Sequence, residues 1–212
     1  YPQPEAGLGT VIAEVPGTSL RQSVGVKFAQ ASGRLPDVDG HWAEAYIRQG
    51  VWSRYIEGYP DGFFHPDRSV SRAEFLKMLA TARPADSLSR PSATDGRLPF
   101  VDMQQHWAAV CVEQALQNGW IFKEEEGETF RPDEPITREE TARWASRYAA
   151  LETRSEGQAP LVDMEAVAAE LRGWVNAALE AGLLQGYEDG TFRPQHFLSR
   201  AEAAAILKRL TT

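Results

Sequence analysis

Three arginines recur in the same short motif, and their chemistry suits the binding of an anion. The motif is written "VSRAEF" (Val70–Phe75), "ITREET" (Ile136–Thr141) and "LSRAEA" (Leu198–Ala203). Each arginine falls eight residues after the phenylalanine of a Phe-x-Pro sequence, so the three copies share one spacing. Arginine binds carboxylates through a charge-assisted and often bidentate fork. The candidate ligand-binding arginines are therefore Arg72, Arg138 and Arg200.

A hydroxyl residue precedes each arginine, and a glutamate stands three residues after that hydroxyl. Ahead of an apolar helical stretch this pattern is a capping box, in which both side chains bond backbone N–H groups at the helix start. The pattern explains the hydroxyl and the glutamate without any ligand, and it predicts helices over 72–81, 138–150 and 200–210. The predicted N-cap residues, which we also count as candidate ligand contacts beside the arginines, are Ser71, Thr137 and Ser199.

The capping box does not explain the arginine. The N-terminus of a helix carries a partial positive charge, which disfavours a cation in the first turn. Two compensating roles remain open. The arginines could pair with acidic segments upstream, at Asp37, Asp102 and Asp163. Alternatively, an anionic ligand could be held by the guanidinium together with the N–H groups of the helix N-terminus.

The motif belongs to a longer internal repeat. Each copy begins with an acidic segment, predicted to lead into a helix over 42–55, 107–119 or 167–181, and continues through a loop with a Phe-x-Pro sequence to the motif helix. The repeats are predicted over 35–83, 99–151 and 161–212, joined by polar connectors. One helix pair cannot bury its apolar face alone, so we predict a mainly all-α fold of three lobes around a pseudo-threefold axis, with grooves between lobes. Residues 1–34 form an N-terminal extension, in which 19–33 could form a short capping helix.

The pattern resembles the S-layer homology module, present here as a triplet. The resemblance rests on "HWAEA" and "HWAAV", on "GYPDG" and "GYEDG", and on the three arginine motifs, and it covers most of the chain. It implies non-covalent anchoring of a surface protein to a secondary cell-wall polysaccharide, commonly through a pyruvylated N-acetylmannosamine unit. It also implies that the motif arginine is a main binding residue, and that the chain is extracellular, in the cell wall or surface layer.

A sugar ligand would add stacking of apolar C–H faces on aromatic rings. Trp42 and Trp107 are candidates, although core packing is the stronger interpretation for both. Tyr59 and Tyr187, on the glycine turns, suit either role. Gly58 and Gly186 are primarily turn residues that could let the backbone approach a ligand. The middle repeat lacks the G-Y-x-D-G turn and the third lacks the first tryptophan, so we expect at least one groove to be weak or empty.

Other chemistry is disfavoured. The net charge of −8 argues against a general nucleic-acid binder, and no apolar run approaches the length of a membrane span. No acid pair in a cleft, no metal-ligand spacing and no cofactor motif is visible, so we predict neither an enzyme nor a cofactor or metal. The start at Tyr1 indicates a processed or trimmed chain. The alternative function is a protein-interaction spindle that uses the same grooves or its acidic face without carbohydrate.

Overall fold

The chain folds into helical repeats, as predicted. The computed structural model describes residues 8–14, 21–27, 35–83, 98–155 and 161–211. Short 3₁₀ turns at Pro36–Val38, Val101–Met103 and Met164–Ala166 lie at the acidic segments. The α-helices of the described ranges are α1 (Glu44–Trp52), α2 (Arg72–Ala82), α3 (Ala109–Gln117), α4 (Lys123–Glu126), α5 (Arg138–Tyr148), α6 (Arg172–Glu180) and α7 (Arg200–Leu210).

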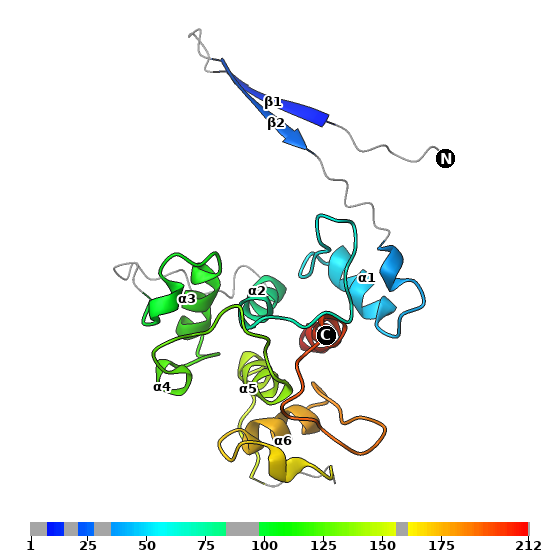
Figure 1. Cartoon of the computed structure of the whole chain (residues 1–212), viewed down its shortest axis with the longest axis vertical. Helices are drawn as coiled ribbons and strands as arrows, with labels where there is room; N and C mark the ends of the chain where they lie inside the picture. Colours follow the sequence, from blue (N-terminus) through cyan, green and yellow to red (C-terminus); the bar gives the residue numbers. More distant parts are fainter. Residues whose placement is uncertain (1–7, 15–20, 28–34, 84–97, 156–160, 212) are drawn as a thin grey trace.

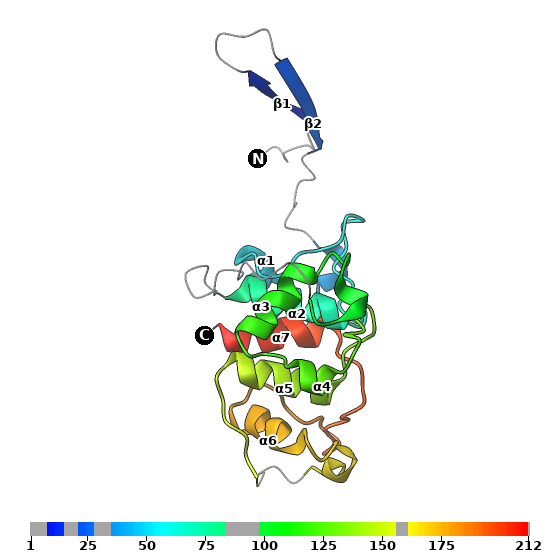
Figure 2. The ribbon, with the colours of Figure 1, turned by 90° about the vertical axis from the view of Figure 1, so that its left-hand side faces the viewer.

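The three motif helices lie at the centre of the bundle. Figure 1 shows α2, α5 and α7 nearly end-on and close together, with α1, α3 and α6 outside them. Each outer helix packs on the motif helix of another repeat, because α1 contacts α7, α3 contacts α2, and α6 contacts α5. The first and last repeats are therefore joined directly, and the lobes in Figure 2 are stacked against a shared helical centre. The first helix of each repeat is therefore buried in part by another repeat.

A closed ring of backbone hydrogen bonds links the segments that lead into the motif helices. The N–H of Val70 donates to the carbonyl of Leu198 at 2.8 Å, that of Leu198 donates to Ile136 at 3.0 Å, and that of Ile136 donates back to Val70 at 3.0 Å. All three side chains are fully buried. The ring fixes the three motifs at one level of the bundle, while the pseudo-threefold axis itself stays a prediction.

The N-terminal extension contains strands where a capping helix was expected. Strand β1 (Leu8–Glu14) pairs antiparallel with β2 (Arg21–Lys27), with Val11 opposite Val24. The prediction of a helix across 21–27 is therefore wrong. Its sequence combines β-branched valines with Gly25, and this composition favours a strand and weakens a helix. The polar connectors fall mostly in 84–97 and 156–160, outside the described residues.

Candidate functional site: arginines at the repeat junctions

All three predicted capping boxes are present. Ser71 Oγ accepts a hydrogen bond from the N–H of Glu74, and the Glu74 carboxylate accepts one from the N–H of Ser71 at 2.9 Å. The same reciprocal pair forms at the starts of α5 and α7. These bonds satisfy two of the unpaired donors that every helix N-terminus carries. The partners in the other two boxes are Thr137 with Glu140, and Ser199 with Glu202.

The remaining N–H groups of the first turn bond to the neighbouring repeat. Arg72 N–H donates to the carbonyl of Glu134, and Ala73 N–H donates to that of Pro132, both at 2.9 Å. The first two N–H groups of α5 and α7 likewise donate to carbonyls of the next repeat's Pro-containing loop. The helix N-termini therefore have no N–H left for an anion. That part of the predicted anion site is wrong, because the helix start is instead a junction between repeats.

The motif arginines are buried at the same junctions. Arg72, Arg138 and Arg200 are 1%, 4% and 4% exposed. In each, Nε donates at 2.9 Å to the carbonyl of the Phe-x-Pro phenylalanine of another repeat. The acceptors are Phe130 for Arg72, Phe192 for Arg138 and Phe64 for Arg200. A recurrent buried bond of this kind gives the arginine a structural role that compensates its unfavourable position in the first turn.

The predicted ion pairs between these arginines and the upstream aspartates do not form. The carboxylate of Asp102 accepts backbone bonds from Phe130 at 2.9 Å and from Arg131 at 2.7 Å. Asp37 and Asp163 accept from the corresponding backbone N–H groups in the other repeats. Each aspartate holds the turn in which the residue after the phenylalanine has a positive φ. This alternative is therefore wrong, and the aspartates stabilise the loop whose carbonyl the arginine bonds.

A groove of about 340 Å³ opens beside Arg200. Its walls come from all three repeats, because Tyr59 and Glu74 belong to the first, Trp107 to the second and Arg200 to the third. Arg200 Nη2 donates to the carbonyl of Glu57 at 2.7 Å, and its Cζ lies 4.4 Å from the centre of the Tyr59 ring. Within the described residues Arg200 forms no salt bridge, and burial lowers its pKa. We call this hollow the Arg200 groove.

The surroundings of Arg138 repeat this plan with one carboxylate added. Nη2 donates to the carbonyl of Gln185 at 2.9 Å, and Nη1 donates to Glu202 at 2.8 Å. The centre of the Tyr187 ring lies 4.6 Å from the Arg138 Cζ and 4.1 Å from that of Arg193, so the ring contacts both guanidinium groups. Burial raises the pKa of Tyr187 to about 12. A shallow hollow outside this ring is lined by Trp42, Gly186, Tyr187, Glu188, Asp189 and Arg193.

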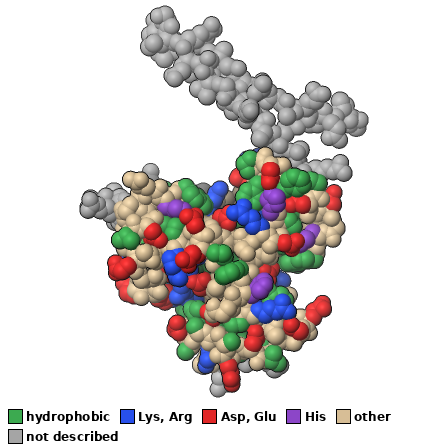
Figure 3. All heavy atoms as spheres, viewed as in Figure 1, with side chains coloured by type: hydrophobic (Ala, Val, Ile, Leu, Met, Phe, Trp, Pro, Cys, Tyr) green, Lys and Arg blue, Asp and Glu red, His purple; other side chains and the backbone are tan. Residues whose placement is uncertain are grey.

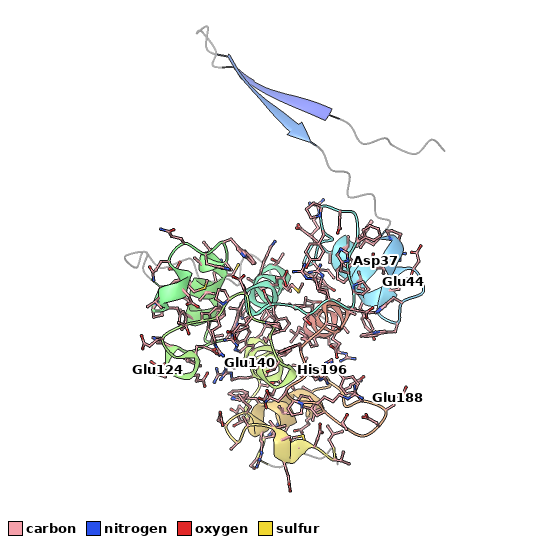
Figure 4. All side chains as sticks on the ribbon, viewed as in Figure 1. Asp37, Glu44, Glu124, Glu140, Glu188 and His196 are labelled. Carbon is pink, nitrogen blue, oxygen red and sulfur yellow. The ribbon has the colours of Figure 1, made fainter. Side chains whose placement is uncertain are left out.

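Arg72 is enclosed by two carboxylates. Its Nη1 donates to Glu140, and its Nη2 donates to Glu126. Burial raises the pKa of Glu140, but the charge of Arg72 and the hydrogen bonds from Thr137 lower it by more, so the pKa is lowered overall. Figure 4 shows Glu140 near the centre of the bundle, on α5. The hollow at this junction, which we call the Arg72 groove, is lined by charged residues that include Arg72, Glu126, Glu140, Arg143 and Glu170.

The aromatic candidates lie on the surface of the grooves. Trp42 is 60% exposed and Trp107 is 57% exposed, so the favoured interpretation of both as core residues is wrong. Their side chains face the hollows beside Tyr187 and Arg200, respectively. Tyr59 and Tyr187 are half-buried, and each donates its hydroxyl to the capping-box glutamate of its own repeat. These four aromatics therefore lie at the junctions of Arg138 and Arg200.

Glycine is required at the start of each aromatic turn by close packing. A Cβ at Gly58 would lie 2.9 Å from Leu35 Cδ2 and 3.1 Å from the Phe63 carbonyl oxygen. A Cβ at Gly186 would lie 2.5 Å from Leu161 Cδ2. These distances are shorter than normal contacts, so the two glycines serve the packing of the loop against the residue that precedes each repeat's acidic segment.

Two site residues were missed by the sequence reasoning. Glu126 and Arg143 both line the Arg72 groove, and Arg143 Nη2 donates to the Glu126 carboxylate at 2.5 Å. The segment "KEEEGE" (123–128) has the composition of an exposed acidic loop, but its third glutamate, Glu126, turns inward in α4. The signal was present in the spacing, because Arg143 stands five residues after Arg138, where the other helices have Lys77 and Ala205.

No other chemistry appears on the described part of the chain. There, no group of histidine, cysteine or acidic residues could hold a metal ion, and no helix has the length and apolarity to cross a membrane. Figure 3 shows acidic and basic side chains interspersed on the face in view, without a continuous patch of one sign. The described part of the chain is therefore an interlocked helical triplet built from repeats, with arginines and aromatics at its junctions.

The chain belongs to the S-layer homology domain family. The family model matches residues 34–76, 99–142 and 161–204, so one match overlaps each predicted repeat. Cell surface glycoprotein 1 of Acetivibrio thermocellus is 32% identical over 76% of this chain, and the Cellulosome-anchoring protein of the same organism is 30% identical over 76%. S-layer protein EA1 of Bacillus anthracis is 28% identical over 84%.

The match spans 7%, 36% and 20% of the lengths of these three relatives. The module is therefore a small part of each of those proteins. Family membership, together with the relatives' names, supports a role in cell-surface anchoring and the predicted location at the cell wall or surface layer.

Proposed function

We propose that the module anchors a surface protein non-covalently to a secondary cell-wall polysaccharide, by binding its pyruvylated N-acetylmannosamine unit. The single observation that carries the proposal is the state of Arg200. Its guanidinium is buried in the wall of an open groove and has no carboxylate partner among the described residues. Glu74 lies in the same groove and acts on Arg200 without a salt bridge to it. A buried cation with no carboxylate in direct contact is costly, and an anionic ligand would reduce that cost.

The walls of the Arg200 groove suit the rest of such a ligand. The exposed ring of Trp107 comes from the second repeat, and the half-buried ring of Tyr59 comes from the first. Apolar ring faces can pack on the C–H face of a sugar, while the ketal-linked carboxylate pairs with the guanidinium. We assign the strongest site to the Arg200 groove. The Arg138 junction has an equivalent aromatic pair, Trp42 and Tyr187, but the carboxylate of Glu202 already pairs with its arginine.

Sedimentation with purified wall sacculi tests the proposal. We expect the module to sediment with untreated sacculi and to remain in solution after the pyruvylated polymer has been removed. Equal binding to both preparations would exclude the pyruvate assignment. Binding to neither, together with capture of a surface protein, would favour the protein-interaction spindle.

A matched pair of surface tryptophans places the site. Trp107→Ala removes a wall of the Arg200 groove, whereas Trp52→Ala removes a tryptophan that is 88% exposed on α1 and lines no hollow described above. We expect at least tenfold weaker binding of the pyruvylated monosaccharide for Trp107→Ala and no change for Trp52→Ala. Equal effects of the two would argue against the Arg200 groove as the site.

A further inference from the structure

The Arg72 groove contains a carboxylate of the protein where the other two junctions have a backbone carbonyl. At Arg138 and Arg200, Nη2 donates to a backbone carbonyl, that of Gln185 or Glu57. At Arg72 the same nitrogen donates to the carboxylate of Glu126, and Nη1 donates to that of Glu140. Arg72 therefore has two anionic partners, Arg138 has one and Arg200 has none within the described residues.

Glu126 is held in this position from two sides. Its side chain is 1% exposed, and its two oxygens accept from Arg72 Nη2 and Arg143 Nη2. The neighbouring Glu125 pairs with Arg147 at 2.6 Å, which fixes α4 against α5. A buried carboxylate is stable when paired and hydrogen-bonded to this extent. Tyrosines lie over the other two arginines, whereas among the described residues the rings over the Arg72 guanidinium are those of Phe130 and Trp144.

The departures of two different repeats meet at this one junction. The middle repeat supplies α4 in place of the G-Y-x-D-G turn, and the third repeat supplies Glu170, which stands where the other repeats have the first tryptophan. Both changes add negative charge to one groove, because the Arg72 groove takes its walls from all three repeats. Like charges placed around a site oppose the entry of a further anion.

We propose that Glu126, as a second carboxylate paired with Arg72, closes the Arg72 groove to the anionic sugar that the other junctions bind. The inference rests on the proposed function for the identity of the sugar. It makes Glu126 a residue that determines how many ligands one module binds.

Calorimetric titration with pyruvylated N-acetylmannosamine provides the first test. Glu126→Ala removes the internal carboxylate, and Glu124→Ala removes an exposed glutamate from the same helix as a matched control. We expect Glu126→Ala to bind one more sugar per chain than the wild type, and Glu124→Ala to bind the same number as the wild type. An unchanged number of sites in a folded Glu126→Ala variant would overturn the proposal.

Rescue by a small carboxylate separates this inference from the proposed function. Acetate should enter the space left by Glu126→Ala and raise its melting temperature by several degrees more than it raises that of Glu124→Ala. If the wild type binds no sugar, the proposed function fails, and acetate rescue alone decides the role of Glu126. Equal shifts for the two variants would then overturn it.

The converse substitution covers the case in which Glu126→Ala does not fold. Tyr59→Glu places a carboxylate beside Arg200, and Tyr59→Gln is its uncharged control. We expect Tyr59→Glu to bind the sugar at least tenfold more weakly at this groove than Tyr59→Gln. Equal affinities would show that an internal carboxylate does not close a groove, and would overturn the proposal.

Discussion

Arg200 Nε donates to the backbone carbonyl of Phe64 at 2.9 Å, across 136 positions of the sequence. The bond joins the last repeat to the first, and Arg72 and Arg138 make the equivalent bond to the repeat that follows each of them. A residue that is implied to bind ligand is thus also a connector of the fold. Because the three arginines are buried and bonded in this way, their truncation should lower the melting temperature.

The first prediction concerns the stability of the Arg200 junction. Arg200→Ala leaves the carbonyls of Phe64 and Glu57 without their donor, and each such loss costs about 1–3 kcal/mol. We expect a clear fall in the free energy of unfolding, measured by denaturant titration. Lys77→Ala, an exposed change in the same groove, should stay within about 0.5 kcal/mol of the wild type. Equal stability of all three proteins would contradict the connector role.

The second prediction separates surface tryptophans from core tryptophans. Trp107 is largely exposed, whereas Trp120 is fully buried beside Tyr148. Trp107→Ala should therefore change the free energy of unfolding by less than about 1 kcal/mol, while Trp120→Ala should cost about 3–5 kcal/mol. Thermal unfolding followed by circular dichroism measures both. A large loss for Trp107→Ala would show that it serves packing after all.

The third prediction concerns acid unfolding through Glu140. Its pKa is lowered in the folded chain from the ordinary value of 4.5, so the folded state binds its proton less readily than the unfolded state does. The stability that this shift contributes is present above about pH 4.5 and is lost as the pH falls through the folded pKa. Glu140→Gln should cost about 1–3 kcal/mol at pH 7 and should flatten the fall in stability below pH 5.

Chemical unfolding of Glu140→Gln at a series of pH values provides the measurement, with Glu188→Gln as an exposed control. Figure 4 places Glu188 at the outer edge of the third repeat, away from Glu140. The control should follow the wild-type pH dependence. The same acid slope in Glu140→Gln as in the wild type would contradict the role assigned to Glu140.

The fourth prediction concerns closure of the bundle. Removal of residues 161–212 takes away α7, on which α1 packs, and Leu198, which bonds to Val70 and Ile136. We expect the remaining two repeats to lose cooperative unfolding and much of their helicity, because α1 and α2 then expose apolar faces to water. Circular dichroism and urea unfolding measure this. A two-repeat chain that unfolds cooperatively with unchanged helicity per residue would contradict it.

The sequence by itself determined what depends on local chemistry. The capping boxes, the helical periodicity and the repeat spacing predicted all three motif helices and their first residues, because a helix start is specified by residues within four positions of each other. The all-α class followed from the same local signals. The hairpin of the N-terminal extension was missed because a short segment with valines and glycine is ambiguous between helix and strand.

Which side chains from different repeats come into contact is known only from the tertiary structure. The loop "KEEEGE" and Glu170 are far from Arg72 in sequence, and nothing local indicates that both line its groove. Whether Trp107 faces core or solvent depends in the same way on packing between repeats. The Arg200 and Arg72 grooves each combine three repeats, so the charge balance of these junctions is set by long-range contacts. For that reason the sequence predicted only that at least one groove would be weak or empty, and the contacts between repeats are what lead us to propose the Arg72 groove, with Glu126 as the cause.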